Sequence, residues 1–128
     1  MSLDLKLLIW SVLLTLAQCV IAAIGAQTQM GLPALAGNRD GLPALTGWAA
    51  RAARAHRNML ESFALFAALV LTAQVSGKAN GTTALGAELF FWARLVYVPI
   101  YLIGIPWVRT GAWAVSIAGL VLILIQLV

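Results

Sequence analysis

The residues best suited to chemistry lie close together in the chain, between positions 51 and 61. Four polar side chains share one face of the helix expected there, because they are spaced by three, four and three residues: Arg51, Arg54, Asn58 and Glu61. Arg57 lies at the edge of this stripe, one turn before Glu61. Guanidinium groups bind carboxylates with paired hydrogen bonds, and an asparagine amide both donates and accepts. The stripe therefore predicts a site for an anionic ligand that forms several hydrogen bonds.

A second polar stripe follows in a later apolar segment, where Arg94, Tyr97 and Tyr101 are spaced by three and four residues. The two segments are expected to be antiparallel neighbours, with Glu61 and Arg94 at matching depth. An unpaired carboxylate within a bilayer costs a few kcal/mol. We therefore expect an ion pair between Glu61 and Arg94, whose main role is to fix the register of the two helices.

The last element of the expected site is the turn at Arg109 and Thr110. The N–H groups at Thr110 and Gly111 would open the next helix and favour an anion, although Thr110 is equally explained as a cap. The arginines have an alternative role as snorkelling side chains that contact lipid phosphate. His56 lies on the opposite side of its helix, and no Ser-His-Asp, paired-carboxylate or metal-ligand pattern is visible.

These residues are embedded in a strongly apolar chain, in which 62% of the 128 residues are hydrophobic and only 9% are charged. Soluble domains carry about a quarter charged residues, so soluble, disordered, disulfide-framed and nucleic-acid-binding classes are excluded. A span of the bilayer needs about 20 helical residues. The sequence predicts one all-α domain over residues 1–128, an integral membrane four-helix bundle with these helices: about 5–27, 48–75, 83–105 and 111–128.

The connections and their charges predict the remaining layout. Two Gly-Leu-Pro-Ala-Leu copies indicate two turns in the loop over 28–47, and Thr82 or Thr83 is expected to cap the third helix. Asp4, Asp40 and Glu88 are expected to be solvated charges. Most arginines fall on one side of the membrane, which puts this side in the cytoplasm and both termini outside it.

The run Arg54-Ala55-His56-Arg57-Asn58, with Glu61 three residues later, resembles the second-helix signature of the MAPEG family, the membrane-associated proteins in eicosanoid and glutathione metabolism. The resemblance extends in order over residues 48–128. The compact loops resemble a bacterial branch, which implies a bacterial inner membrane. It implies a homotrimer in the lipid bilayer, with glutathione bound between subunits. By position, it implies that the ligand is held by these residues: Arg54, Arg57, Asn58, Glu61, Arg94, Tyr97 and Tyr101.

The same resemblance implies the chemistry. Arg109 would stabilise the glutathione thiolate, with Thr110 as a hydroxyl donor, and the thiolate would attack a lipophilic electrophile or hydroperoxide dissolved in the bilayer. A nearby cation favours the thiolate form of a thiol. Leu65 stands where many members have proline, so a non-catalytic structural or lipid-binding protein of the same fold is the alternative. A small transporter is less favoured, because its expected acidic residue, Asp4, precedes the apolar run.

Overall fold

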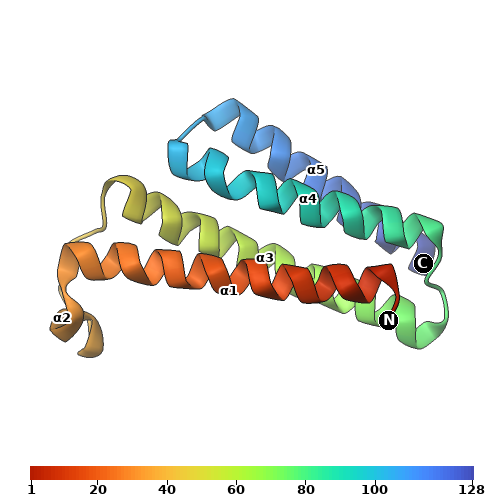
Figure 1. Ribbon diagram of the computed structural model, residues 1–128, viewed down its shortest axis with the longest axis horizontal. Coiled ribbons are helices and arrows are strands. Elements are labelled where there is room, and N and C mark those ends of the chain that lie inside the picture. The colour runs from red at the N-terminus through yellow and green to blue at the C-terminus, as the bar shows by residue number, and fades with distance from the viewer.

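The computed structural model describes every residue from Met1 to Val128, and all of its regular secondary structure is helical (Figure 1). It contains five helices: α1 (Leu3–Met30), α2 (Leu32–Ala36), α3 (Gly47–Ser76), α4 (Gly81–Ile103) and α5 (Pro106–Leu127). All except α2 are long and apolar enough to cross a membrane. The all-α bundle with four spanning helices is therefore confirmed, and the expected bounds are met to within a few residues, except at the start of α5.

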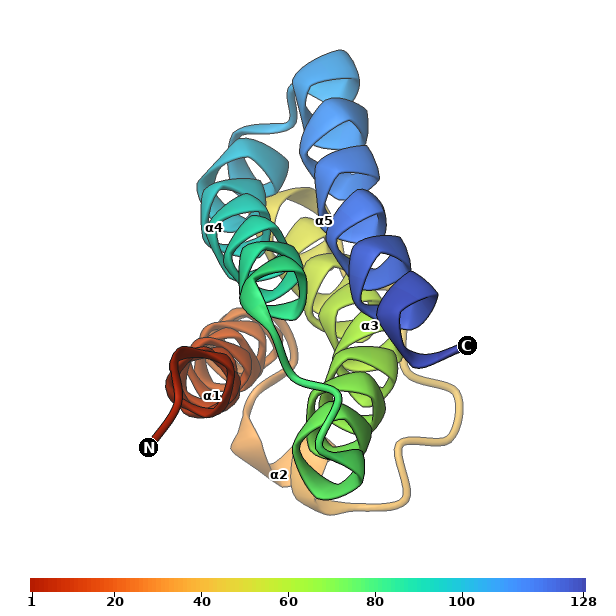
Figure 2. The same ribbon diagram turned by 90° about the vertical axis from the view of Figure 1, so that its right-hand side faces the viewer.

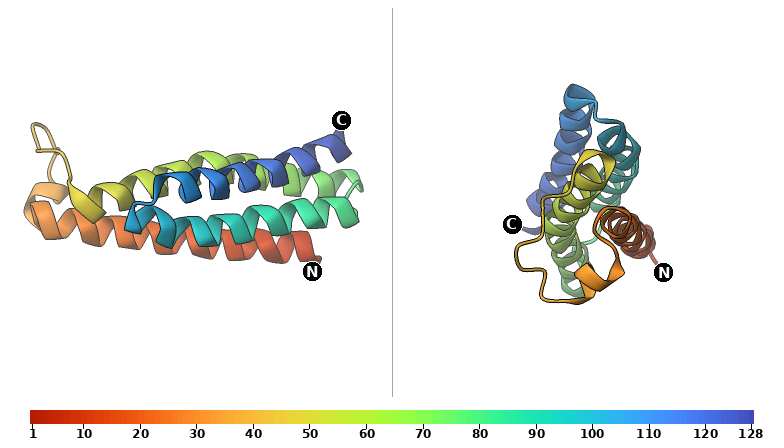
Figure 3. Two further views of the ribbon diagram at one scale, coloured as in Figure 1. Left: turned by 90° about the horizontal axis from the view of Figure 1, so that it is seen from above. Right: turned by 90° about the vertical axis from the view of Figure 1, so that its left-hand side faces the viewer.

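The four long helices lie at the corners of a quadrilateral when the bundle is viewed along its axis (Figure 2). α1 and α3 form one antiparallel pair, and α4 and α5 form a second (Figure 1). Seen from above, α1 and α4 share one layer while α3 and α5 share the other (Figure 3). α3 and α4 touch across the short diagonal, whereas α1 and α5 make no contact.

The two ends of the bundle differ in what they carry. At one end, called the termini end, lie both chain termini and the α3–α4 turn over 77–80 (Figure 1). At the other, called the loop end, lie α2 and the α4–α5 turn at Gly104 and Ile105. Gly104 ends α4 in the left-handed region, at φ 89°, which glycine adopts without steric cost. This tight turn places the start of α5 beside the end of α4.

The core is aromatic at the contact between α3 and α4. Phe66 and Phe90 stack with their ring centroids 4.1 Å apart, and both side chains are fully buried. α4 and α5 approach so closely that a Cβ atom on Gly86 would lie 2.6 Å from the carbonyl oxygen of Gly119. Small residues at such a crossing allow backbones in a membrane to pack directly.

The loop over 28–47 differs from the two expected turns. The first Gly-Leu-Pro copy continues into the short helix α2, with Pro33 in its first turn, a position that suits proline because no amide hydrogen is needed there. The second copy stays extended before α3. Its end is held by Gln29, whose side chain donates to the Thr46 carbonyl at 2.7 Å and accepts from the Thr46 amide at 3.0 Å.

Two helix starts also differ from expectation. Asn80, not Thr82 or Thr83, caps α4: its side chain accepts from the amides of both threonines, while the Thr83 hydroxyl accepts from the Asn80 amide. This reciprocal arrangement is a capping box. α5 begins at Pro106, so Thr110 is not a cap.

Asp4 is not the solvated charge expected from its position near the N-terminus. It is only 5% exposed, and its Oδ2 accepts a hydrogen bond of 2.9 Å from the Thr83 hydroxyl. Both residues lie in the first turn of their helices, where the positive end of the helix dipole stabilises a carboxylate. Asp4 therefore joins α1 to α4 at the termini end.

Candidate functional site

Most of the expected site residues gather at the loop-end side of α3, α4 and α5. A hollow of about 130 Å³ is lined there by one residue of α3, one of α4 and three of α5: Asn58, Tyr97, Arg109, Thr110 and Trp113. Residues from three helices therefore meet in one small space, although they are up to 55 positions apart in the chain.

A series of hydrogen bonds between α3 and α4 positions this hollow. Three α3 side chains face α4, as their spacing predicts, and take part in these contacts: Arg51 Nε donates to the Leu102 carbonyl at 2.9 Å, Arg54 Nε to the Tyr101 hydroxyl at 3.1 Å, and Arg94 Nη1 to Asn58 Oδ1 at 2.8 Å. The Leu102 carbonyl lies in the last turn of α4, where helix carbonyls lack a partner of their own. The contacts fix the two helices in register.

Cations and tyrosine rings alternate along the same side of α4. The Arg94 guanidinium lies 4.2 Å from the centroid of the Tyr97 ring, and Arg109 lies 4.6 Å from that of Tyr101. The two rings are 5.3 Å apart. Cations are attracted to the electron-rich face of an aromatic ring, so the rings hold both guanidinium groups in place without neutralising them.

The expected ion pair between Glu61 and Arg94 is wrong. Arg94 is fully buried, its one hydrogen bond goes to Asn58, and its Nε and Nη2 have no partner. Glu61 is exposed instead. Glu61 follows Asn58 by three residues, which rotates its side chain by about 300° around the helix axis. This is about 60° short of a full turn, so Glu61 points away from the side of α3 that carries Asn58. The side chain of Arg54 is long enough to reach α4 from a similar angle, whereas that of glutamate is shorter.

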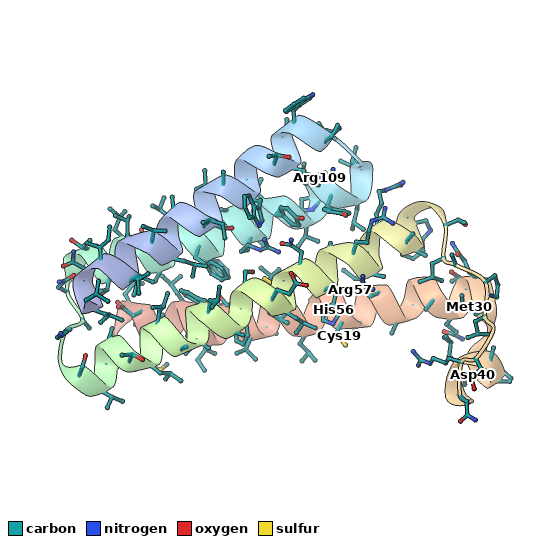
Figure 4. The ribbon with its side chains drawn as sticks, turned by 180° about the vertical axis from the view of Figure 1, so that it is seen from behind. Cys19, Met30, Asp40, His56, Arg57 and Arg109 are labelled. Atoms are coloured by element: carbon teal, nitrogen blue, oxygen red, sulfur yellow. The ribbon has the colours of Figure 1, made fainter.

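The expected site residues therefore divide into three groups. Asn58, Tyr97, Arg109 and Thr110 line the hollow itself. Three more lie beside it through the contacts described above: Arg54, Arg94 and Tyr101. Arg57 and Glu61 are exposed on α3 and do not line it. Figure 4 shows Arg109 on α5, well separated from Arg57 on α3.

Thr110 lines the hollow, but the expected anion site at the amides of Thr110 and Gly111 is wrong. Because α5 begins at Pro106, both amides lie beyond the first turn, where helix N–H groups bond within the helix. The Thr110 hydroxyl donates to the Pro106 carbonyl at 3.0 Å. Its oxygen lone pairs remain able to accept from a ligand.

Trp113 is the hollow's one lining residue that the sequence assigns no role in the site. It is 41% exposed and forms part of the rim. The signal that could have identified it is its spacing, because it follows Arg109 by four residues and therefore shares its face of α5. An indole at this point adds a large, flat, apolar surface to an otherwise polar space.

His56 is half-buried and does not line the hollow; its Nδ1 is buried without a partner. Figure 4 places it on α3 next to Arg57. No group of three histidine, cysteine, aspartate or glutamate side chains lies close enough to hold a metal ion.

Comparison with known proteins gives one match. The model of the MAPEG family matches residues 7–128, which is nearly the whole chain. No curated protein and no solved structure matches the chain.

Proposed function

The chain belongs to the MAPEG family, which includes glutathione transferases and peroxidases, and from this premise we propose that it is a membrane-embedded, glutathione-dependent transferase or peroxidase. It is an integral membrane protein that crosses the bilayer several times. The proposed substrates are lipophilic electrophiles or hydroperoxides dissolved in the same bilayer.

One observation carries the proposal: three guanidinium groups surround one pair of tyrosine rings, and no carboxylate contacts any of them. Arg54 donates to Tyr101, Arg94 to Asn58, and Arg109 rests on the Tyr101 ring. Unneutralised cations in a membrane protein are costly and mark binding sites for anions. Glutathione, with two carboxylates and an ionisable thiol, supplies the missing negative charge.

The hollow suggests a role for each residue that lines it. The Arg109 guanidinium has no hydrogen-bond partner in the chain, so it is free to hold the thiolate and favour its formation. Asn58 uses its oxygen on Arg94, which leaves its NH₂ group to donate to the peptide part of the ligand. Trp113 offers the electrophile an apolar surface at the rim.

The size of the hollow favours a site that a second copy of the chain completes. Ligand pockets commonly enclose about 300–1,000 Å³, whereas this hollow holds about 130 Å³. Arg57 and Glu61 are exposed on α3, and charged side chains rarely face lipid. In the proposed homotrimer these two residues face a neighbouring subunit and the glutathione bound beside it.

The charges also suggest an orientation. Judged by the helix bounds, five arginines lie at or near the loop end, and the two lysines lie at the termini end: Arg39, Arg51, Arg54, Arg57 and Arg109 against Lys6 and Lys78. Positive residues favour the cytoplasmic side. The proposed site therefore faces the cytoplasm, where glutathione would enter, and both termini lie outside it.

The test is thiolate formation in the purified protein. Addition of glutathione to the wild type is expected to produce the ultraviolet absorbance of a bound thiolate, and conjugation of an aryl halide should follow. Arg109→Ala should remove the absorbance and lower conjugation about 100-fold, the usual loss for one group that stabilises developing charge. Arg39→Ala is the matched control, because Arg39 only donates to the Leu35 carbonyl in the loop. A wild-type protein with neither absorbance nor conjugation would contradict the proposal.

A non-catalytic structural or lipid-binding role is the second candidate. It is favoured by the separation of Arg57 and Glu61 from the hollow, since both would hold glutathione in an active member. Under this role, Arg57→Ala would change stability alone and leave no difference in glutathione binding.

A further inference from the structure

A second polar site lies away from the hollow, at Gln18 near the middle of α1. This side chain is only 3% exposed, and neither its Oε1 nor its Nε2 has a hydrogen-bond partner in the chain. Buried amides are almost always paired, with protein or with ordered water. An unpaired amide in the interior of a membrane bundle therefore points to a ligand.

Gln18 cannot turn outward to find a partner elsewhere, because its helix is fixed on both sides. It belongs to a row of buried α1 residues spaced by seven: Asp4, Ser11, Gln18 and Gly25. Asp4 is bonded to Thr83 of α4. At Gly25 a Cβ atom would lie 2.9 Å from the Ala49 Cβ, so α1 is pressed against α3 there. The amide is thus held toward the inside of the bundle.

A void of about 10 Å³ adjoins the side chain, between α1, α3 and α4. Apart from Gln18 its lining is apolar, with two residues from α3 and two from α4 beside one from α1: Ala52, Ala55, Val98, Leu102 and Ile21. This volume is about that of one probe sphere, the lower limit for holding a single water molecule. A larger ligand would not fit inside the void.

Next to the void, the backbone hydrogen bonding of α4 is interrupted by a proline. Pro99 lies between Val98 and Leu102 within α4 and has no amide hydrogen. The Leu95 carbonyl, one turn earlier, therefore lacks its usual helical donor. A water molecule needs two to four polar partners. The oxygen and the nitrogen of the Gln18 amide are two such groups, and we infer that the freed carbonyl of α4 is a third.

We propose that the void is a binding site for one buried water molecule, held by the Gln18 amide and linking α1 to the backbone of α4. Ala52 and Ala55 are small enough to leave room for it, which larger α3 side chains would not. Ala55 also packs against Tyr97 and Tyr101, so the water lies behind the rings that border the hollow. The site needs no glutathione and stands independently of the proposed function.

The first test compares two identical substitutions. Gln18→Met keeps the length of the side chain and removes its hydrogen bonds, so the melting temperature should fall by about 5 °C as the water loses its site. Gln74→Met is the matched control: Gln74 also has a buried, unpartnered Nε2 but does not line the void, and we expect little change. An unchanged or higher melting temperature in Gln18→Met would overturn the proposal, because it would mean that the amide is unpaired.

The second test reads the water directly and covers the case in which Gln18→Met fails to fold. In wild-type protein labelled with ¹⁵N-glutamine and held in lipid nanodiscs, the Gln18 side-chain amide should show rotating-frame cross-relaxation with a long-lived water. The signal should be the same with and without glutathione. Absence of the signal, with the Gln18 amide resonances assigned, would overturn the proposal.

Discussion

The two ends of the bundle use polar residues in opposite ways. At the termini end three polar side chains have partners within the chain: Asp4 is bonded to Thr83, Asn80 to Gln126 at 2.8 Å, and Lys78 to the Leu127 carbonyl at 3.2 Å. Toward the loop end, the arginines donate to neutral groups or rest on rings, and Arg94 keeps two unpartnered nitrogens in the interior.

This difference separates structural polar residues from candidate binding residues. A polar group that is hydrogen-bonded within the chain already has a stabilising partner and needs no ligand. Cations that surround a hollow without a counter-charge are compensated only when an anion binds. The polar contacts at the termini end thus hold α1, α4 and α5 together, whereas the loop-end side is suited to binding a ligand.

The largest expected effect on stability comes from Asn58→Leu at the hollow. This change removes the one hydrogen bond of the buried Arg94, and loss of a buried charge's partner costs about 3 kcal/mol. We expect a marked fall in the melting temperature together with loss of glutathione binding. Glu61→Gln is the control for the melting temperature alone, because Glu61 is exposed and does not contact Arg94.

A double-mutant cycle sharpens this prediction. Asn58→Leu and Arg94→Leu should be strongly non-additive, whereas Glu61→Gln and Arg94→Leu should add to within about 0.5 kcal/mol. Coupling between Glu61 and Arg94, with none between Asn58 and Arg94, would contradict the contacts described here.

A smaller effect is expected from Thr83→Val at the termini end. The substitution keeps the shape of the side chain but removes the hydroxyl that donates to Asp4 and completes the Asn80 capping box. The buried carboxylate is left unpaired, at a cost of about 2 kcal/mol in unfolding free energy. Glutathione binding should be unchanged at temperatures where the protein is folded. Thr72→Val, at an exposed threonine of α3 bonded only to its own helix, should cost little; equal losses in both variants would refute the role of Asp4.

The sequence predicts the four long helices because an apolar run of about 20 residues spans a bilayer as a helix, in which every backbone group is bonded within the segment. It also predicts that Arg51, Arg54 and Asn58 face one neighbour, since spacing fixes the relative angle of residues on a helix. Spacing does not fix how far each side chain reaches or how the neighbouring helix is rotated. The pairing of Arg94 with Asn58 rather than Glu61 depends on both.

The differences at the helix starts depend on local backbone geometry that the sequence does not specify. Asn80 and Thr83 are both good caps, and only the backbone geometry decides that the asparagine occupies the cap while the threonine completes the box. The turn at Gly104 is so short that Pro106 begins α5, which carries Thr110 into the helix. Trp113 is a residue type typical of membrane-interface anchors. Its place at the hollow follows from the position of α5 against α3.

The smallest expected effect is a gain, from Gly111→Ala on α5. No atom lies within 4 Å of the added Cβ, so the higher helix propensity of alanine should stabilise the protein by about 0.5–1 kcal/mol. A thermal melt of the detergent-solubilised protein measures it. A loss of stability, with a shift of the oligomer toward monomer, would contradict an open surface here and place a neighbouring copy against Gly111.

The central claim is that the unpaired cations around the hollow bind an anionic thiol. It is tested most directly by a crystallographic or cryo-electron microscopy map of the protein with glutathione added. The account predicts density for the tripeptide in contact with Asn58 and Arg109, with its sulfur against the Arg109 guanidinium. An empty hollow at saturating glutathione, or glutathione bound elsewhere in the bundle, would contradict it.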